Sequence, residues 1–135
     1  MSDETFQSGY SDTALYVHIP FCTQMCRYCS FYSEPIASHD VAAVVGALIA
    51  EIIKYKSQLI RTVYIGGGSP SCLPPEHLFR LIDKIIEYWP NPIEFTVELN
   101  PGQVSQEILK QLYRRGINRL SIGAQSFSQS ELKDD

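Results

Sequence analysis

Three of the chain's four cysteines are close neighbours in the sequence. Cys22, Cys26 and Cys29 are separated by three and then two residues, within "YVHIPFCTQMCRYCSFY" at positions 16–32. Thiolates that converge from one loop can hold a metal centre. Structural zinc sites take four closed ligands, often as two CxxC pairs, and ferredoxin clusters take four cysteines at other spacings. Three ligands with one vacant position therefore favour an iron–sulfur cluster in which one iron is open to a substrate.

The fourth cysteine, Cys72, stands apart, beyond "GGGSP" and next to a proline-rich turn. We predict that it is an ordinary residue. If it were a fourth ligand, the cysteines would form a plain electron-transfer or zinc module. That alternative leaves the glycines, Glu98 and Gln125 without a role.

Three further candidates follow predicted strands. The glycines of "GGGSP" (66–70) would let a ligand approach the backbone and expose N–H groups, although glycine runs often form only turns. Glu98 in "TVELNP" and Gln125 in "LSIGAQSF" are either ligand contacts or solvated polar residues. A carboxylate such as Glu98 accepts two hydroxyl or ammonium hydrogens at once, which suits a binding role.

The elements that must position these residues alternate along the chain. The predicted strands cover residues 14–19, 61–68, 92–102 and 118–127. Asp40 caps a first helix that runs to about residue 58, Pro74 and Pro75 open a second, and Gly116 closes a third. The apolar positions that mark the three helices are Val41, Val44, Val45, Leu48, Ile49, Ile52 and Ile53; Leu78, Leu81, Ile82, Ile85 and Ile86; and Ile108, Leu109, Leu112 and Tyr113.

This βαβαβαβ order predicts an α/β fold with a parallel sheet and right-handed crossovers. The strands are apolar and β-branched, so we expect both faces of the sheet to be buried. The carboxyl ends of parallel strands meet at one edge, where the chemistry of such folds is placed. Four strands are too few for an eight-stranded barrel. Ser128 and Glu131 have capping-box spacing just before the sequence stops, which predicts a truncated longer domain.

The composition is that of a globular protein, with 44% hydrophobic and 19% charged residues. A net charge of −4 gives no electrostatic basis for binding nucleic acid. No apolar run approaches the ~20 residues of a membrane span. Residues 1–13 form a polar tail rather than a signal peptide. Clustered cysteines without a secretory signal indicate a reducing compartment, so we predict a cytoplasmic protein.

The CxxxCxxC pattern after a strand, with Tyr28 before the third cysteine, resembles the signature of the radical S-adenosylmethionine (SAM) superfamily. "LYVHIPFC" and "YCSFYS" are similar to one branch of it, which holds the oxygen-independent coproporphyrinogen III oxidases and the HemW heme chaperones. The resemblance covers residues 14–135. It implies that these residues are the N-terminal portion of a radical SAM core domain, a partial (β/α)6 TIM-like barrel, and that residues 1–13 are a tail.

In that superfamily three cysteines hold a [4Fe-4S] cluster, and SAM chelates the fourth iron through its amino and carboxylate groups. An electron from the cluster cleaves SAM into methionine and a 5′-deoxyadenosyl radical, which removes a hydrogen atom from a substrate. The resemblance thus implies that Cys22, Cys26 and Cys29 are the metal ligands. "GGGSP" corresponds to the family's GGGTP, and Ser69 keeps the hydroxyl of the threonine. The cofactor-binding residues that the resemblance implies are Tyr16, Tyr28, Gly67, Gly68, Ser69, Glu98 and Gln125.

Within the branch, the coproporphyrinogen oxidases carry a further cysteine where this chain has Phe31. The resemblance therefore favours a heme chaperone, which binds and transfers heme as cargo. The alternative is the oxidase, which decarboxylates two propionates of a porphyrin precursor to vinyl groups. A small reductant protein such as flavodoxin or ferredoxin is an implied partner.

The histidines and the aromatic residues beside the cysteines are weaker candidates. His18 could be a heme or metal ligand, but a histidine at a strand end is more often a hydrogen-bonded packing residue. His39 and His77 are expected at the surface, and Phe31 and Tyr32 are expected to pack around the cysteine loop.

Overall fold

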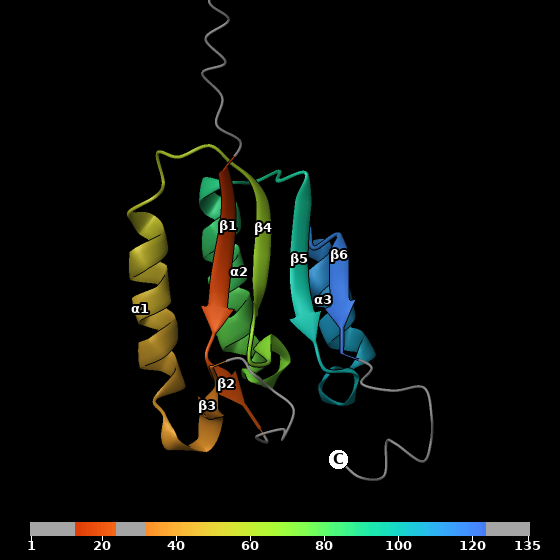
Figure 1. Ribbon diagram of the computed structural model, residues 1–135. Coiled ribbons are helices and arrows are strands. Elements are labelled where there is room, and N and C mark those ends of the chain that lie inside the picture. The colour runs from red at the N-terminus through yellow and green to blue at the C-terminus, as the bar shows by residue number, and fades with distance from the viewer. Residues whose placement is uncertain (1–12, 24–31, 124–135) are drawn as a thin grey trace, which may run out of the picture.

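The computed structural model describes residues 13–23 and 32–123, and these form a parallel sheet with helices on one side (Figure 1). The main sheet has the order β1-β4-β5-β6, and all its strand pairs are parallel. The strands are β1 (Thr13–Ile19), β4 (Ile60–Gly67), β5 (Glu94–Leu99) and β6 (Arg119–Ile122), and the helices are α1 (Val41–Ile53), α2 (Pro75–Tyr88) and α3 (Gln106–Arg114). The predicted α/β alternation is confirmed.

The helix ends follow local capping chemistry. The Asp40 side chain accepts a hydrogen bond of 3.1 Å from the Ala43 amide at the start of α1, as predicted. Helix α1 ends at Ile53 rather than near residue 58, because the residues that follow are polar and exposed and offer no further apolar stripe. Gly116 closes α3 with a φ of 92°, a conformation that suits glycine.

One face of the sheet packs against the helices and forms the core. In Figure 1, α2 and α3 lie behind the strands and α1 lies alongside α2. The predicted stripes of α1 and α2 face this core, whereas Tyr113 of α3 points away and is 80% exposed. The strand residues buried on this face are Val17, Ile19, Val63, Ile65, Phe95, Val97 and Leu99.

The opposite face is mostly polar and partly exposed among the described residues, so the expectation that both faces are buried is not met there. Alternate residues along each strand point to opposite faces, and the register aligns one polar or aromatic row across the sheet. That row runs from Tyr16 through Tyr64 and Thr96 to Arg119. No described helix covers this face. The residues on it, here called the open face, are Tyr16, His18, Tyr64, Glu94, Thr96, Glu98, Arg119 and Ser121.

A small second sheet follows β1. Strand β2 (Phe21–Cys22) pairs in parallel with β3 (Glu34–Pro35), and the Glu34 amide donates a 2.7 Å hydrogen bond to the Pro20 carbonyl. The sequence pattern predicts only a loop here. Three short 3-10 helices complete the described elements: η1 (Ile36–Ser38), η2 (Pro70–Cys72) and η3 (Pro101–Gln103).

Several predictions fall outside the described residues. They concern Cys26, Tyr28, Cys29, Phe31 and Gln125, the tail up to residue 12, the strand beyond residue 123 and the helix expected from Ser128. Thr13, predicted to end the tail, is the first residue of β1. None of the described helices is long and apolar enough to cross a membrane.

Candidate functional site

The candidate site lies at the edge of the sheet where β1, β4 and β5 end. Cys22 follows β1, the glycine run ends β4, and Glu98 lies near the end of β5. Figure 1 shows β2 and β3 just past the arrowhead of β1. The parallel sheet therefore gathers these predicted residues at one edge, as the alternation of strands and helices indicates.

The chain from Phe21 to Tyr32, here called the cysteine segment, is held by hydrogen bonds at both ends. At its start, the Gly68 and Ser69 amides each donate a 2.7 Å hydrogen bond, to the carbonyls of Ile19 and Phe21. At its end, Nε2 of His18 lies 3.1 Å from the Tyr32 carbonyl. The described residues on both sides of the segment, Phe21 and Tyr32, are therefore held near the carboxyl ends of β4 and β1. Cys26 and Cys29 lie in the chain between them, so their ligand roles stay predictions.

The glycines have a different local role from the expected one. We expected their amides to be exposed for a ligand, but Gly67 donates to Oε2 of Glu98 at 3.1 Å, and Gly68 donates to the backbone before Cys22. A Cβ on Gly68 would overlap the Phe21 carbonyl and lie 3.1 Å from Sγ of Cys22. Gly67 has a φ of 113°, which side chains disfavour. The glycines allow the backbone of β4 to touch the start of the cysteine segment.

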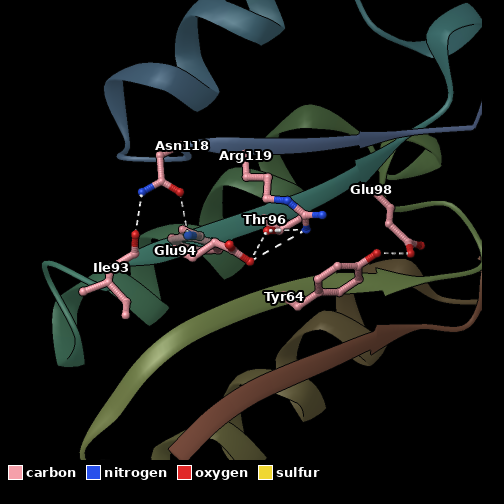
Figure 2. Close-up of polar contacts among 8 residues, drawn as sticks. Tyr64, Ile93, Glu94, Thr96, Glu98, Asn118 and Arg119 are labelled. Atoms are coloured by element: carbon pink, nitrogen blue, oxygen red, sulfur yellow. Dashed lines mark hydrogen bonds and ion pairs between the residues drawn. The ribbon is translucent and has the colours of Figure 1, made fainter. Parts of the chain in front are cut away.

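Glu98 is held on the open face by two donors. The Tyr64 hydroxyl donates to its Oε1, as Figure 2 shows, and the Gly67 amide donates to its Oε2. A Cβ on Gly66 would come within 2.6 Å of the Tyr64 ring and 2.8 Å of the Glu98 carboxyl carbon. Burial, and then the hydrogen bond to Glu98, raise the pKa of Tyr64. A carboxylate has about four acceptor positions, so the described residues leave room on Glu98 for a ligand.

Tyr64 connects Tyr16 and Glu98, two candidates that the sequence identifies, although no motif in the sequence singles out Tyr64 itself. Its ring centroid lies 5.9 Å from that of Tyr16, which is 56% exposed on the same face. The only signal in the sequence is its position two residues before Gly66, which puts both residues on one face of β4. Tyr16, Tyr64 and Glu98 thus form a continuous surface next to the glycine run.

His18 has partners at both ring nitrogens. The Tyr16 hydroxyl lies 3.1 Å from Nδ1, and Nε2 faces the Tyr32 carbonyl. A carbonyl only accepts, so Nε2 carries the proton and Nδ1 accepts from the tyrosine. This arrangement matches the expected packing role rather than a ligand role.

Cys72 lies close to the start of the cysteine segment. Its thiol donates to the Phe21 carbonyl at 3.5 Å, and burial, followed by the nearby Cys22, raises its pKa to about 11. Within residues 13–23 and 32–123, no three His, Cys, Asp or Glu side chains are grouped to hold a metal ion. These contacts favour an ordinary structural role for Cys72.

A second polar cluster lies at the other end of the open face (Figure 2). Asn118 accepts from the Phe95 amide at 2.8 Å and donates to the Ile93 carbonyl at 3.2 Å. Arg119 lies 3.7 Å from Glu94 and 3.4 Å from the Thr96 hydroxyl. These contacts join β6 to β5 at the amino ends of the strands, far along the strands from Cys22, and we assign them to the fold.

The chain was compared with known protein families and structures. The model of the radical SAM superfamily matches residues 16–134. The heme chaperone HemW of Lactococcus lactis is 41% identical over 120 residues, covering 87% of this chain and 32% of the relative. An oxygen-independent coproporphyrinogen III oxidase of Paracoccus denitrificans is 32% identical over 122 residues, covering 84% of this chain and 27% of the relative.

The fold comparison agrees with the sequence comparison. The structure of coproporphyrinogen III oxidase (HemN) from Escherichia coli, described as a radical SAM enzyme, matches with a TM-score of 0.77. It is 28% identical, and the match covers 89% of this chain and 29% of that one. The chain thus spans about a third of the length of the curated relatives it matches. Because the superfamily model covers most of the sequence, the chain belongs to the radical SAM superfamily.

Proposed function

We propose that Cys22, Cys26 and Cys29 hold a [4Fe-4S] cluster and that SAM binds beside it along the carboxyl edge of the sheet. The observation that carries this proposal is the fastening of both ends of the cysteine segment to β1 and β4, beside the half-satisfied carboxylate of Glu98. Cys26 and Cys29 lie in the sequence between these two fastened ends, and with Cys22 they would supply three thiolates without a fourth cysteine. When bound, the reduced cluster supplies one electron to the sulfonium of SAM.

The described residues fit this pair of cofactors. Thiolates are the usual ligands of iron–sulfur clusters, and Sγ of Cys22 lies beside Gly68, where an added Cβ would be 3.1 Å from it. Glu98 offers acceptor positions for hydroxyl or ammonium groups, and Tyr16 offers an exposed ring beside it. Gly67 and Gly68 lie between Glu98 and Cys22, because Gly67 donates to Glu98 and Gly68 lies against Cys22, and Ser69 follows them in the chain. Tyr28 and Gln125 complete the proposed SAM contacts.

For the whole protein we propose a HemW-like heme chaperone that binds and transfers heme. Phe31 stands where the resemblance expects a further cysteine in an oxidase, and the relative named HemW shares a higher identity than the oxidase does. The second candidate is an oxygen-independent coproporphyrinogen III oxidase, which the structural match to HemN favours. A reductant such as flavodoxin or ferredoxin and a cytoplasmic setting belong to both proposals.

The cofactor proposal is tested by anaerobic reconstitution of the full-length protein. We expect a [4Fe-4S] spectrum whose electron paramagnetic resonance signal changes when SAM is added. Cys26→Ala should abolish the cluster, since two thiolates would remain. A cluster that ignores SAM would contradict the open iron, and a normal iron and sulfide content in Cys26→Ala would contradict the ligand set.

The two candidate roles are separated by one pair of assays on the same preparation. A chaperone should bind heme in a titration followed by absorbance and leave coproporphyrinogen unchanged. Decarboxylation of coproporphyrinogen would establish the oxidase instead.

Cys72→Ser tests the plain electron-transfer or zinc module. We expect the variant to keep its full cluster, because the Cys72 thiol is bonded to the Phe21 carbonyl. Loss of the cluster would instead make Cys72 a fourth ligand.

A further inference from the structure

One side-chain amide joins three segments at the carboxyl edge. Oε1 of Gln103 accepts from the hydroxyls of Ser69 and Ser71, each at 2.8 Å. Its Nε2 donates to Oγ1 of Thr23, also at 2.8 Å. Gln103 ends η3 after β5, the two serines flank Pro70 after β4, and Thr23 follows Cys22. The amide therefore links the cysteine segment to the glycine segment.

The hydrogen bond to the Gln103 amide fixes whether the Ser69 hydroxyl can donate or accept. The Ser69 hydroxyl has one proton, and its two neighbours in the cluster, Gln103 and Ser71 at 2.9 Å, compete for it. The Ser71 oxygen already accepts from the Asn100 amide at 2.9 Å, and its own proton goes to Gln103. The Ser69 proton is thus held inside the cluster, and the oxygen is left to act toward a ligand only as an acceptor.

A fixed acceptor is the chemistry that an ammonium group requires. The SAM amino acid end carries an α-ammonium, and hydrogen bonds to charged groups are stronger than neutral ones. A hydroxyl that rotates freely would have to be ordered when the ligand binds, and that ordering costs free energy. Gln103 removes this cost because it holds the hydroxyl in advance.

We propose that Gln103 is a positioning residue that orients Ser69 as an acceptor for the ammonium group of SAM. This inference rests on the proposed SAM site. Gln103 acts through Ser69 rather than by touching the ligand itself. Its second bond, to Thr23, keeps the amide in the orientation that presents Oε1 to the serines.

The test measures SAM binding to the full-length protein with its cluster reconstituted. Gln103→Leu should raise the dissociation constant of SAM by up to about tenfold, because the Ser69 hydroxyl would then have to be ordered when SAM binds, with iron content unchanged. Gln103→Glu keeps an acceptor for both serines, and its second oxygen can accept from the Thr23 hydroxyl, so SAM binding should stay close to that of the wild type. Gln106→Leu, the same change at an exposed residue of α3, is the matched control and should have no effect.

A double-mutant cycle separates positioning from general loss of structure. In a Ser69→Ala background, Gln103→Leu should not weaken SAM binding further, because the group it orients is gone. Thr23→Val, which removes only the anchor of Nε2, should weaken SAM binding about threefold and should not add to Gln103→Leu. It provides a second route to the answer if Gln103→Leu folds poorly.

Three results would overturn the inference: unchanged SAM affinity in Gln103→Leu, additive losses with Ser69→Ala, or parallel loss of iron and SAM. Failure of the proposed function itself looks different. In that case the wild-type protein with a full cluster would not bind SAM at all.

Discussion

The two faces of the main sheet are built from alternate residues of the same strands, yet they serve different ends. On β4, Val63 and Ile65 are 1% and 0% exposed against the helices, whereas Tyr64, between them, reaches Glu98 on the open face. On β5, Val97 is fully buried and Glu98 beside it holds a hydrogen-bonded carboxylate. Because successive side chains of a strand point to opposite faces, adjacent residues belong to the core and to the proposed binding face in turn.

Substitutions on the two faces should therefore have different effects on stability and on binding. Side chains on the helix face contribute apolar burial, so their loss should lower stability and spare binding. Side chains on the open face make few apolar contacts and direct polar groups toward the proposed cofactors. Their loss should lower binding and spare stability.

The largest effect is expected on the helix face. Ile65→Ala leaves a cavity under α2 and should lower the free energy of unfolding by about 2–5 kcal/mol. Folded protein of this variant should bind SAM as the wild type does. Urea unfolding and SAM titration of one preparation test both halves. A loss of stability below about 1 kcal/mol would contradict the assignment of this face to the core.

A smaller effect is expected at the carboxyl edge. Gly68→Ala forces a methyl group onto the Phe21 carbonyl and should lower the free energy of unfolding by about 1–3 kcal/mol. The iron content should also fall well below that of the wild type, because the methyl group displaces Cys22. Chemical iron analysis and urea unfolding measure the two effects.

Gly46→Ala is the matched control for this change. Gly46 lies in α1, where an added Cβ would meet no atom of the described residues within 4 Å apart from its own helix, so the change should stabilise the protein by about 0.5–1 kcal/mol. Iron content in this variant should be that of the wild type. If Gly68→Ala and Gly46→Ala contained equal amounts of iron, the result would contradict the claim that contact between β4 and the cysteine segment supports the cluster.

The open face is expected to affect binding alone. Tyr64→Phe removes one donor to Glu98 and should weaken SAM binding about three- to tenfold, while stability changes by about 1 kcal/mol or less. Combined with Glu98→Gln, it should add little, since both act on one carboxylate. A calorimetric cycle tests this coupling, and full additivity would show that Tyr64 and Glu98 act separately.

The smallest effect concerns pH at the end of the cysteine segment. The Tyr32 hydroxyl and then the nearby His39 lower the pKa of Glu34 below its ordinary value of 4.5. Because the folded pKa is depressed, the stabilisation is complete above pH 4.5 and is lost as pH falls through the folded value. The stability difference between the wild type and Glu34→Gln should shrink in that range. A difference independent of pH would contradict the ionised contact.

Much of the fold could be predicted because it depends on neighbours in the sequence. The Asp40 cap, the apolar stripe of α2 and the closing Gly116 each follow from interactions within a few residues. The polar face could not be predicted from overall apolarity. The polarity of that face depends on which set of alternate residues in each strand points toward the helices, and packing decides that choice.

The candidate site divides in the same way. The spacing of the cysteines, the glycine run and Glu98 indicate the proposed chemistry, whereas Tyr64 and Gln103 carry no recognisable local pattern. Tyr64 meets Glu98 across 34 residues, and Gln103 meets Thr23 across 80. Such pairs are set by strand register and loop packing, which a single sequence does not display.

The sequence by itself determined the superfamily and the alternation of the main-sheet strands with the helices, and it predicts thiolate ligands. These properties follow from residue chemistry and from periodicity over short distances. Only the tertiary structure decided that the glycine amides are used inside the protein, that His18 and Cys72 have internal partners, and that Glu98 is held by Tyr64. The physical reason is that hydrogen bonds between distant segments depend on how the sheet and helices pack.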